Sequence, residues 1–142
     1  MTITRCDLND ASILEGLFSV LYKPELKWSR ELIEQEIRSG RKIYFIALEE
    51  DVLGAFGIEL EEREAKFGPI SIKPQYQKRG VGSQLIRFAE SLARGRGLVR
   101  IWCHSLERYH TEGFYEYHGW KMEKFIKDFW DGQNCYLFSK EL

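Results

Sequence analysis

Two glycines, Gly80 and Gly82, open an amphipathic helical pattern and directly follow the basic residues Lys78 and Arg79. The first N–H groups of a helix lack intrahelical partners and carry a partial positive charge. Glycines let a ligand approach this backbone closely, and the two basic side chains add positive charge. These residue types in this order favour binding of a phosphate or pyrophosphate group.

The spacing excludes the two commonest phosphate-binding motifs. A dinucleotide fingerprint requires a third glycine three residues after Gly82, where the chain has Leu85. A P-loop requires a lysine between its last glycine and the following Ser or Thr, but here Ser83 follows Gly82 directly. Taken alone, the glycines leave two interpretations open, a phosphate loop and an ordinary helix start.

The cysteines and histidines do not form a metal motif. Cys103, His104, His110 and Cys135 have side chains that ligate zinc, but no pair has the spacing of a structural site. The three cysteines are widely spaced without a C-x-x-C, so a disulfide framework is not expected. We therefore expect no bound metal, and the cysteine usage fits a reducing compartment.

Composition restricts the class of protein. The chain has 142 residues, of which 44% are hydrophobic and 30% charged, which predicts one globular domain over residues 1–142. The formal net charge of −1 argues against a dedicated binder of nucleic acids or anionic membranes. The longest apolar run, residues 43–48, is far too short for a membrane span, and the N-terminus lacks a signal-peptide core. We expect a soluble, cytoplasmic protein.

Apolar periodicity and β-branched runs predict the elements that position these residues. Strands are expected at residues 3–8, 42–48, 52–60, 65–72, 98–104, 120–126 and 134–140. Helices are expected from the cap Asp10 to Pro24, from the cap Ser29 to Gly40, from Val81 to the glycines at 95 and 97, and from Leu106 to Tyr117. The order describes an α/β fold class with one mixed sheet covered by helices. Pro69 predicts a bulge or broken pairing within its strand.

Several stretches resemble the GNAT N-acetyltransferase superfamily over nearly the full length of the chain. "QKRGVG" (77–82) fits Q/R-x-x-G-x-G/A, the acetyl-coenzyme A signature of that superfamily. "GFYEYHGWKME" is similar to its F-Y-x-x-x-G-F stretch, with Trp120 replacing the usual phenylalanine, and "LEEDVLGAFGI" and "YLFSKEL" resemble its hairpin and last strand. The resemblance implies a mostly antiparallel, twisted sheet of about seven strands, flanked by about four helices and splayed between its fourth and fifth strands.

The resemblance also implies roles for individual residues. Acetyl-coenzyme A would be the co-substrate, with no metal. Its pantetheine arm would lie on the disrupted strand at Ile70, Ser71 and Ile72, and its pyrophosphate on Gln77, Lys78, Arg79, Gly80, Val81, Gly82 and Ser83. Tyr115 matches the general acid that protonates the departing thiolate, which suits a phenol with a pKa of ~10. Its aromatic neighbours leave a packing role open.

The general base and the acceptor site are less defined. Where some family members have a glutamate as general base, this chain has Lys66. The remaining candidates for the base are Glu59, Glu61, Glu64 and His104. Of these, histidine has a reference pKa near neutral. Loops 21–29 and 127–133 are expected to form the acceptor site. Tyr22, Trp28, Phe129 and Trp130 would wall it, or would pack the loops down, and Asp128 and Asp131 would attract a cationic amine.

The resemblance predicts an enzyme that transfers an acetyl group from acetyl-coenzyme A to a primary amine by direct attack in a ternary complex. The alternative is a non-catalytic domain that binds or senses acyl-coenzyme A. A third interpretation, nucleic-acid binding, rests on seven basic residues, Lys73, Lys78, Arg79, Arg87, Arg94, Arg96 and Arg100. The phosphates of coenzyme A and a solvated helix face explain these better, so no nucleic-acid or membrane partner is expected. Family members are often homodimers, but no part of the sequence fixes the oligomeric state.

Overall fold

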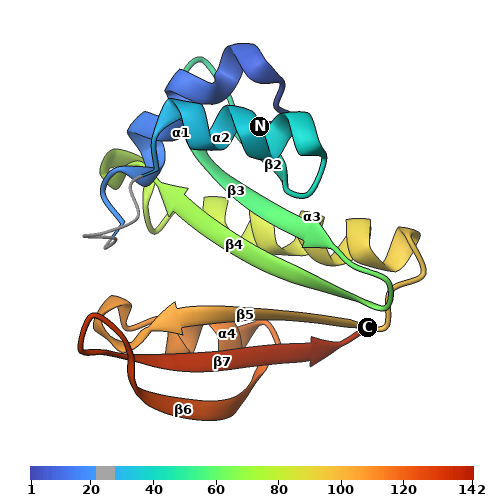
Figure 1. Ribbon diagram of the computed structural model, residues 1–142, viewed down its shortest axis with the longest axis vertical. Helices are drawn as coiled ribbons and strands as arrows, with labels where there is room; N and C mark the ends of the chain where they lie inside the picture. The colour runs from blue at the N-terminus through green and yellow to red at the C-terminus, as the bar shows by residue number, and fades with distance from the viewer. Residues whose placement is uncertain (22–27) are drawn as a thin grey trace.

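The computed structural model describes residues 1–21 and 28–142, whose strands form one sheet with the order β1-β2-β3-β4-β5-β7-β6 (Figure 1). The strands are β1 (Thr2–Arg5), β2 (Ile43–Leu48), β3 (Val52–Leu60), β4 (Glu64–Ile72), β5 (Arg100–Leu106), β6 (Lys121–Trp130) and β7 (Gln133–Glu141). The helices of the described ranges are α1 (Ala11–Phe18), α2 (Arg30–Ser39), α3 (Val81–Gly95) and α4 (Glu112–Tyr117). The predicted helix end at Pro24 lies outside the described residues.

The sheet is antiparallel except where β4 and β5 meet. These two strands run parallel and pair from Glu64–Lys66 to Arg100–Trp102. Beyond these residues β4 and β5 diverge, and Figure 1 shows the gap between them widening toward their C-terminal ends. The mixed sheet and the splay between the fourth and fifth strands confirm the predicted fold class.

The predicted disruption at Pro69 is confirmed as a bulge in β4. Phe56 of β3 pairs with Ile70, and Ile58 pairs with Phe67, so two residues of β4 stand opposite one residue of β3. Proline has no N–H to donate to the ladder, which explains why pairing breaks here. Gly57, the single residue opposite the bulge, allows this close approach, because a Cβ there would lie 3.1 Å from the carbonyl oxygen of Gly68.

Two apolar clusters hold helices against opposite faces of the sheet, because successive strand side chains alternate between faces. On one face, α3 buries Val81, Leu85, Ile86, Ala89 and Ala93 against strand residues that include Phe45, Phe56 and Phe67. On the other face, α1 and α2 bury Leu14, Leu17, Phe18 and Ile33 against Tyr44, Ile46 and Ala55. The sheet thus separates α3 from α1 and α2.

The helix boundaries agree with the prediction in part. The oxygen Oγ of Ser29 accepts a hydrogen bond from the Leu32 amide at 3.2 Å, and Gly40 is left-handed with φ of 71°, so both ends of α2 are confirmed. The prediction of Asp10 as an N-cap is right in position, because Asp10 directly precedes α1, but wrong in its bonding, because its side chain makes no capping hydrogen bond to that helix. Asp7 is the cap of a short 3-10 turn, and Asp10 instead accepts a hydrogen bond from the Asp7 amide at 2.9 Å.

The prediction of one helix from residue 106 to residue 117 is also wrong. Strand β5 continues to Leu106, a 3-10 turn covers Glu107–Tyr109, and α4 begins only at Glu112. His110 has a φ of 52°, in the left-handed region, and a residue in this conformation ends a right-handed helix. The interruption leaves a loop at the C-terminal end of β5.

Candidate active site

The loop between β4 and α3 presents a helix N-terminus without a side-chain cap. Gly80 is left-handed with φ of 82° and takes the cap position, and the Gln84 amide donates to the Gly80 carbonyl at 3.1 Å. The amides of Val81, Gly82 and Ser83 precede this first intrahelical bond and therefore lack helical acceptors. Together with the helix dipole, they form a site for an anion.

The surroundings of this N-terminus favour a phosphate group. Lys78 and Arg79 are exposed, and the Arg79 guanidinium lies 5.8 Å from the centre of the Tyr76 ring. The Gln77 side chain donates to the Ile72 carbonyl at 3.0 Å and ties the loop to the end of β4. A Cβ on Gly82 would lie 3.4 Å from the Phe114 ring, so a larger residue there would crowd the first turn.

The end of β4 offers further backbone groups. The Lys73 amide donates to the Leu53 carbonyl at 2.9 Å, so Lys73 faces β3. Backbone polar groups alternate between the two sides of a strand, so those of Ile70 and Ile72 face the opposite side, toward β5. Within the described ranges, the pairing with β5 ends at Lys66, so the Ile70 groups and the Ile72 amide have no strand partner there.

Ser71 has a different role from its two neighbours. Its side chain is buried and its hydroxyl donates to the Leu17 carbonyl at 2.7 Å, at the end of α1. By the same alternation, its backbone faces β3, where it pairs with Ala55. Ser71 therefore joins α1 to the sheet beside the bulge.

Tyr115 lies inside the core. Its side chain is 3% exposed, and its ring stacks on Phe138 at 4.7 Å and lies 5.2 Å from Trp120. Burial is the main cause that raises the pKa of Tyr115 well above its ordinary value. A smaller contribution comes from the neighbouring Cys103, which accepts a hydrogen bond from the Tyr115 hydroxyl. A phenol in this state holds a proton, so Tyr115 can act as an acid but not as a base.

His104 lies on the other face of β5. Its ring is half-buried between Trp102, at 5.1 Å, and Phe129, at 4.7 Å. Burial, and after it the positive charge of Lys66, lowers the pKa of His104 below its ordinary value. The imidazole is therefore neutral at pH 7 and able to accept a proton.

The carboxylate candidates for a general base are engaged in ion pairs or exposed. Glu59 stands opposite Lys66 in the β3–β4 register, and its carboxylate lies 3.2 Å from the Arg41 guanidinium. Glu64 binds Arg100 at 2.7 Å, and Glu61 is exposed in the turn after β3. His104 is partly buried, and its pKa is shifted toward the neutral form.

The described aromatic residues of the predicted acceptor loops contact different elements of the chain. Trp28 lies against Phe18 at 5.5 Å, with the Lys42 ammonium 5.5 Å from its ring centre. Trp130 ends β6 and pairs with Gln133 across the hairpin, and Phe129 contacts His104. Tyr22 is outside the described residues.

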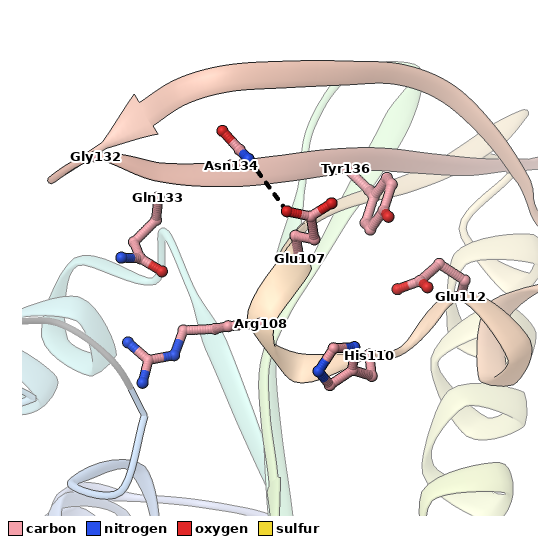
Figure 2. Close-up of a pocket in the computed structure, with 8 residues that line it drawn as sticks. All are labelled: Glu107, Arg108, His110, Glu112, Gly132, Gln133, Asn134 and Tyr136. Atoms are coloured by element: carbon pink, nitrogen blue, oxygen red, sulfur yellow. Dashed lines mark hydrogen bonds between the residues drawn. The ribbon is translucent and has the colours of Figure 1, made fainter.

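A pocket of about 350 Å³ lies where β5 ends and β7 begins (Figure 2). Its lining residues are mostly polar: Glu107, Arg108, His110, Glu112, Gly132, Gln133, Asn134 and Tyr136. Asn134 donates to Glu107 at 3.1 Å, and burial, followed by the charges of Glu112 and Glu107, raises the pKa of Tyr136. One oxygen of Glu112 is buried without a hydrogen-bond partner among the described residues. Two carboxylates against the single guanidinium of Arg108 favour a cation in this pocket.

The sequence match decides the family. Residues 40–122 match the profile of the Acetyltransferase (GNAT) domain, and this segment runs from β2 through α4. It covers more than half of the chain. The chain belongs to the GNAT acetyltransferase family. This confirms the family predicted from the glycine motif and the later aromatic motif.

Solved structures share the fold of this GNAT chain. An aminoglycoside 6′-N-acetyltransferase complexed with coenzyme A is 18% identical, with a TM-score of 0.84 over 99% of this chain and 97% of its own. The aminoglycoside 6′-N-acetyltransferase of Enterococcus faecium is 18% identical, with a TM-score of 0.82 over 99% and 97%. The spermidine N-acetyltransferase of Vibrio cholerae, in complex with CoA and spermine, is 19% identical, with a TM-score of 0.82 over 99% and 94%.

Within residues 1–21 and 28–142, no group of three or more His, Cys, Asp or Glu side chains is arranged to hold a metal ion. In the same residues, no helix has the length and apolar character needed to cross a membrane.

Trp120 of this GNAT domain has a partner that the sequence analysis missed. Its indole N–H donates to the buried Glu90 carboxylate at 2.9 Å, and Lys140 donates to the other oxygen of Glu90 at 2.9 Å. A phenylalanine at this position would have no hydrogen-bond donor. The tryptophan therefore supplies a hydrogen bond to the Glu90 carboxylate, whose burial without a partner would cost free energy. No local spacing relates these three residues, which lie on α3, before β6 and on β7.

The environment of His104 generates a prediction. Replacing Lys66 by methionine removes a positive neighbour, so the pKa of His104 should rise toward its ordinary value, as measured by NMR titration of the imidazole. Lys140→Met, which removes a charge elsewhere, should leave the His104 pKa unchanged. Since the folded protein holds this imidazole neutral, the unfolded chain binds a proton first as the pH falls through about 6.5, and the free energy of unfolding decreases. An equal pKa in all three proteins would contradict this account.

Proposed function

We propose that this GNAT domain transfers an acetyl group from acetyl-coenzyme A to a primary amine by direct attack in a ternary complex. The proposal rests on one observation: the N-terminus of α3 has no side-chain cap, and it follows the end of β4, where backbone groups have no strand partner. The similarity in fold to acetyltransferases solved with coenzyme A supports it.

The two features fit two parts of the coenzyme. The amides of Val81, Gly82 and Ser83 would bind the pyrophosphate, with Gln77, Lys78, Arg79 and Gly80 shaping and charging the loop. The free backbone groups of Ile70 and Ile72 would hydrogen bond to the amides of the pantetheine arm, as an added strand would. Ser71 would contribute by fixing the strand against α1 through its bond to Leu17.

Tyr115, the candidate acid, and His104, the candidate base, lie on opposite faces of β5. Tyr115 contacts Cys103, while His104, the next residue on the strand, faces the other way. The amine nitrogen would form a bond to the thioester carbonyl carbon as the carbon–sulfur bond breaks. His104 would take the proton that the amine loses, and Tyr115 would give its proton to the departing thiolate. Glu59, held by Arg41, is the second candidate for the base.

The pocket of Figure 2 supports a positively charged acceptor. Glu107 and Glu112 contribute two carboxylates against the single guanidinium of Arg108, so these charged groups sum to a negative charge. An ammonium group supplies up to three donors. We therefore place a second cationic group of the acceptor in this pocket. Trp28 and Trp130 remain candidates for further contacts with the acceptor.

The alternative function is a non-catalytic domain that binds acyl-coenzyme A. The complete burial of Tyr115, with its hydroxyl engaged by Cys103, is the observation that favours it. Such a domain would bind acetyl-coenzyme A but release no free thiol with any amine. Measurement of thiol release across a panel of amines separates the two functions.

We also propose a cytoplasmic location, supported by three buried free cysteines. Recovery of the native protein in an exported fraction would contradict this location. A homodimer, the assembly of many family members, is a further proposal, and light scattering of the purified protein at the mass of one chain would exclude it.

Acetyl-coenzyme A should stabilise the protein by ~2.7 kcal/mol at 100 times its Kd, measured by thermal unfolding, whereas NAD and ATP should not.

Gly82→Val should weaken the binding of acetyl-coenzyme A about tenfold or more, because the side chain crowds the phosphate-binding turn and removes at least one charge-assisted hydrogen bond. Gly95→Ala, at the other end of α3 where no atom lies within 4 Å of the added Cβ, is the matched control. Equal affinity of both variants in calorimetry would reject the assignment of the loop.

Tyr115→Phe should lower kcat by ~10²–10⁴-fold if the hydroxyl is the general acid, while the Kd of acetyl-coenzyme A stays the same. Tyr117→Phe on the same helix, with a side chain that is 76% exposed, should have wild-type rates. Steady-state kinetics and calorimetry check both variants. An unchanged kcat in Tyr115→Phe means that Tyr115 only packs the core.

Glu112→Gln should raise the KM for a short aliphatic diamine several-fold, since it removes the negative charge that attracts the second ammonium group. The KM for acetyl-coenzyme A should not change. Glu116→Gln, at an exposed position of the same helix, is the control. If both variants had a similar KM for the diamine, the proposal that the acceptor binds in this pocket would be contradicted.

A further inference from the structure

The first turn of α3 carries a hydroxyl group that is tied to a histidine from a distant part of the chain. The oxygen Oγ of Ser83 lies 2.9 Å from Nε2 of His118. Ser83 directly follows Gly82, in the turn that would bind the pyrophosphate. His118 directly follows α4 and is 9% exposed. The pair therefore links α4 to the proposed phosphate site.

The position of the His118 ring is well defined. Phe114 and Tyr117 each place a ring centre 5.1 Å from that of the imidazole. The Lys140 ammonium donates to the His118 carbonyl at 2.7 Å, and the His118 amide donates to the Tyr115 carbonyl at 3.1 Å. Contacts with both ring and backbone thus hold Nε2 at Ser83.

The direction of the Ser83–His118 hydrogen bond decides what the serine can do. If the hydroxyl donates to Nε2, its only proton is used and it cannot donate to an anion. If Nε2–H donates to Oγ, the hydroxyl proton is free for a phosphate oxygen. Hydrogen bonds in such a chain polarise one another, and a charged acceptor strengthens the last bond.

We propose that His118 is a positioning residue for the cofactor: its Nε2–H donates to Ser83, whose hydroxyl then donates to the diphosphate of coenzyme A. This inference rests on the proposed function. His118 would not touch the ligand itself, because Ser83 stands between them. The role deepens the assignment of the glycine loop by adding a side-chain donor to the backbone amides.

The charges around His118 support a neutral imidazole in the free protein. Burial lowers its pKa, the positive charges of Arg87 on α3 and Lys140 on β7 lower it further, and Glu90 on α3 opposes this shift. A bound diphosphate adds negative charge at the other end of the chain of hydrogen bonds and should raise the pKa. Binding should then take up a proton, so affinity increases as the pH falls.

A double-mutant cycle on binding affinity tests the chain. In calorimetry at pH 7.5, Ser83→Ala should weaken coenzyme A binding about tenfold, since a bond to a charged acceptor is lost. His118→Leu should weaken it several-fold, and the double variant should bind no more weakly than Ser83→Ala alone. Additive losses would overturn the proposal, because independent effects do not pass through one hydroxyl. Thermal unfolding of each variant checks that the affinities refer to folded protein.

A conservative variant and a second ligand sharpen the test. His118→Gln keeps an N–H donor but cannot titrate, so it should bind like the wild type at pH 7.5. With dephospho-coenzyme A, which keeps the diphosphate and lacks the 3′-phosphate, wild-type affinity should increase from pH 8 to pH 6, but that of His118→Gln should not. Identical pH profiles, or an effect of Ser83→Ala confined to ligands with the 3′-phosphate, would overturn the assignment.

The binding results distinguish a failure of the proposed function from a failure of the role proposed for His118. Failure of the wild-type protein to bind coenzyme A rejects the proposed function itself. Binding with an additive cycle rejects only the role of His118. Imidazole nitrogen NMR of the free protein gives a readout that needs no ligand, since it reports which nitrogen carries the proton. A proton on Nδ1 alone would overturn the proposal, and a proton on Nε2 is the expected result.

Discussion

The site depends on an interruption in the hydrogen bonding of the sheet, where β4 reaches Gly68 and Pro69. Proline donates no hydrogen bond to the ladder, and two residues of β4 then share one partner residue on β3. On the other side of β4, pairing with β5 ends at Lys66. A continuous ladder would satisfy every backbone group and leave none for a ligand. The interruption therefore supplies both the opening and the polar groups beside it.

Packing outside the ladder keeps the two halves of the sheet together. Helix α3 buries one face against both halves, since its cluster contains Phe56 of β3, Phe67 of β4 and Ile101 of β5. The Glu90 carboxylate on α3 also accepts hydrogen bonds from Trp120 and Lys140. Because these contacts fix α3 behind the splay, its N-terminus remains beside the open end of β4. The hydrophobic core thus joins the two halves of the sheet behind the gap.

The alternation of side chains along β5 gives the proposed chemistry its geometry. Cys103 and His104 are neighbours in sequence but face opposite sides of the sheet. The first contacts the buried Tyr115, whose pKa is raised, and the second lies beside Lys66 and Phe129, with its pKa lowered. The two environments differ because one face is covered by α4 and the other is only partly covered. The proposed acid, Tyr115 of α4, and the proposed base, His104 of β5, therefore lie on opposite faces of that strand.

The sequence alone determined the elements that depend on local preferences. Ser29 and Gly40 bound α2 because a serine side chain and a left-handed glycine each complete a helix end. Pro69 predicted the bulge because its missing N–H is a covalent property, and the glycine motif predicted the loop before α3. Local reasoning failed at residues 106–117, where apolar spacing suggested a continuous helix and His110 takes a left-handed conformation. Only the tertiary structure decided the bond of Ser83 to His118, the partners of Glu90 and the pocket between β5 and β7. Each of these joins residues that are distant in the chain, and folding brings them together through the core rather than through any local pattern.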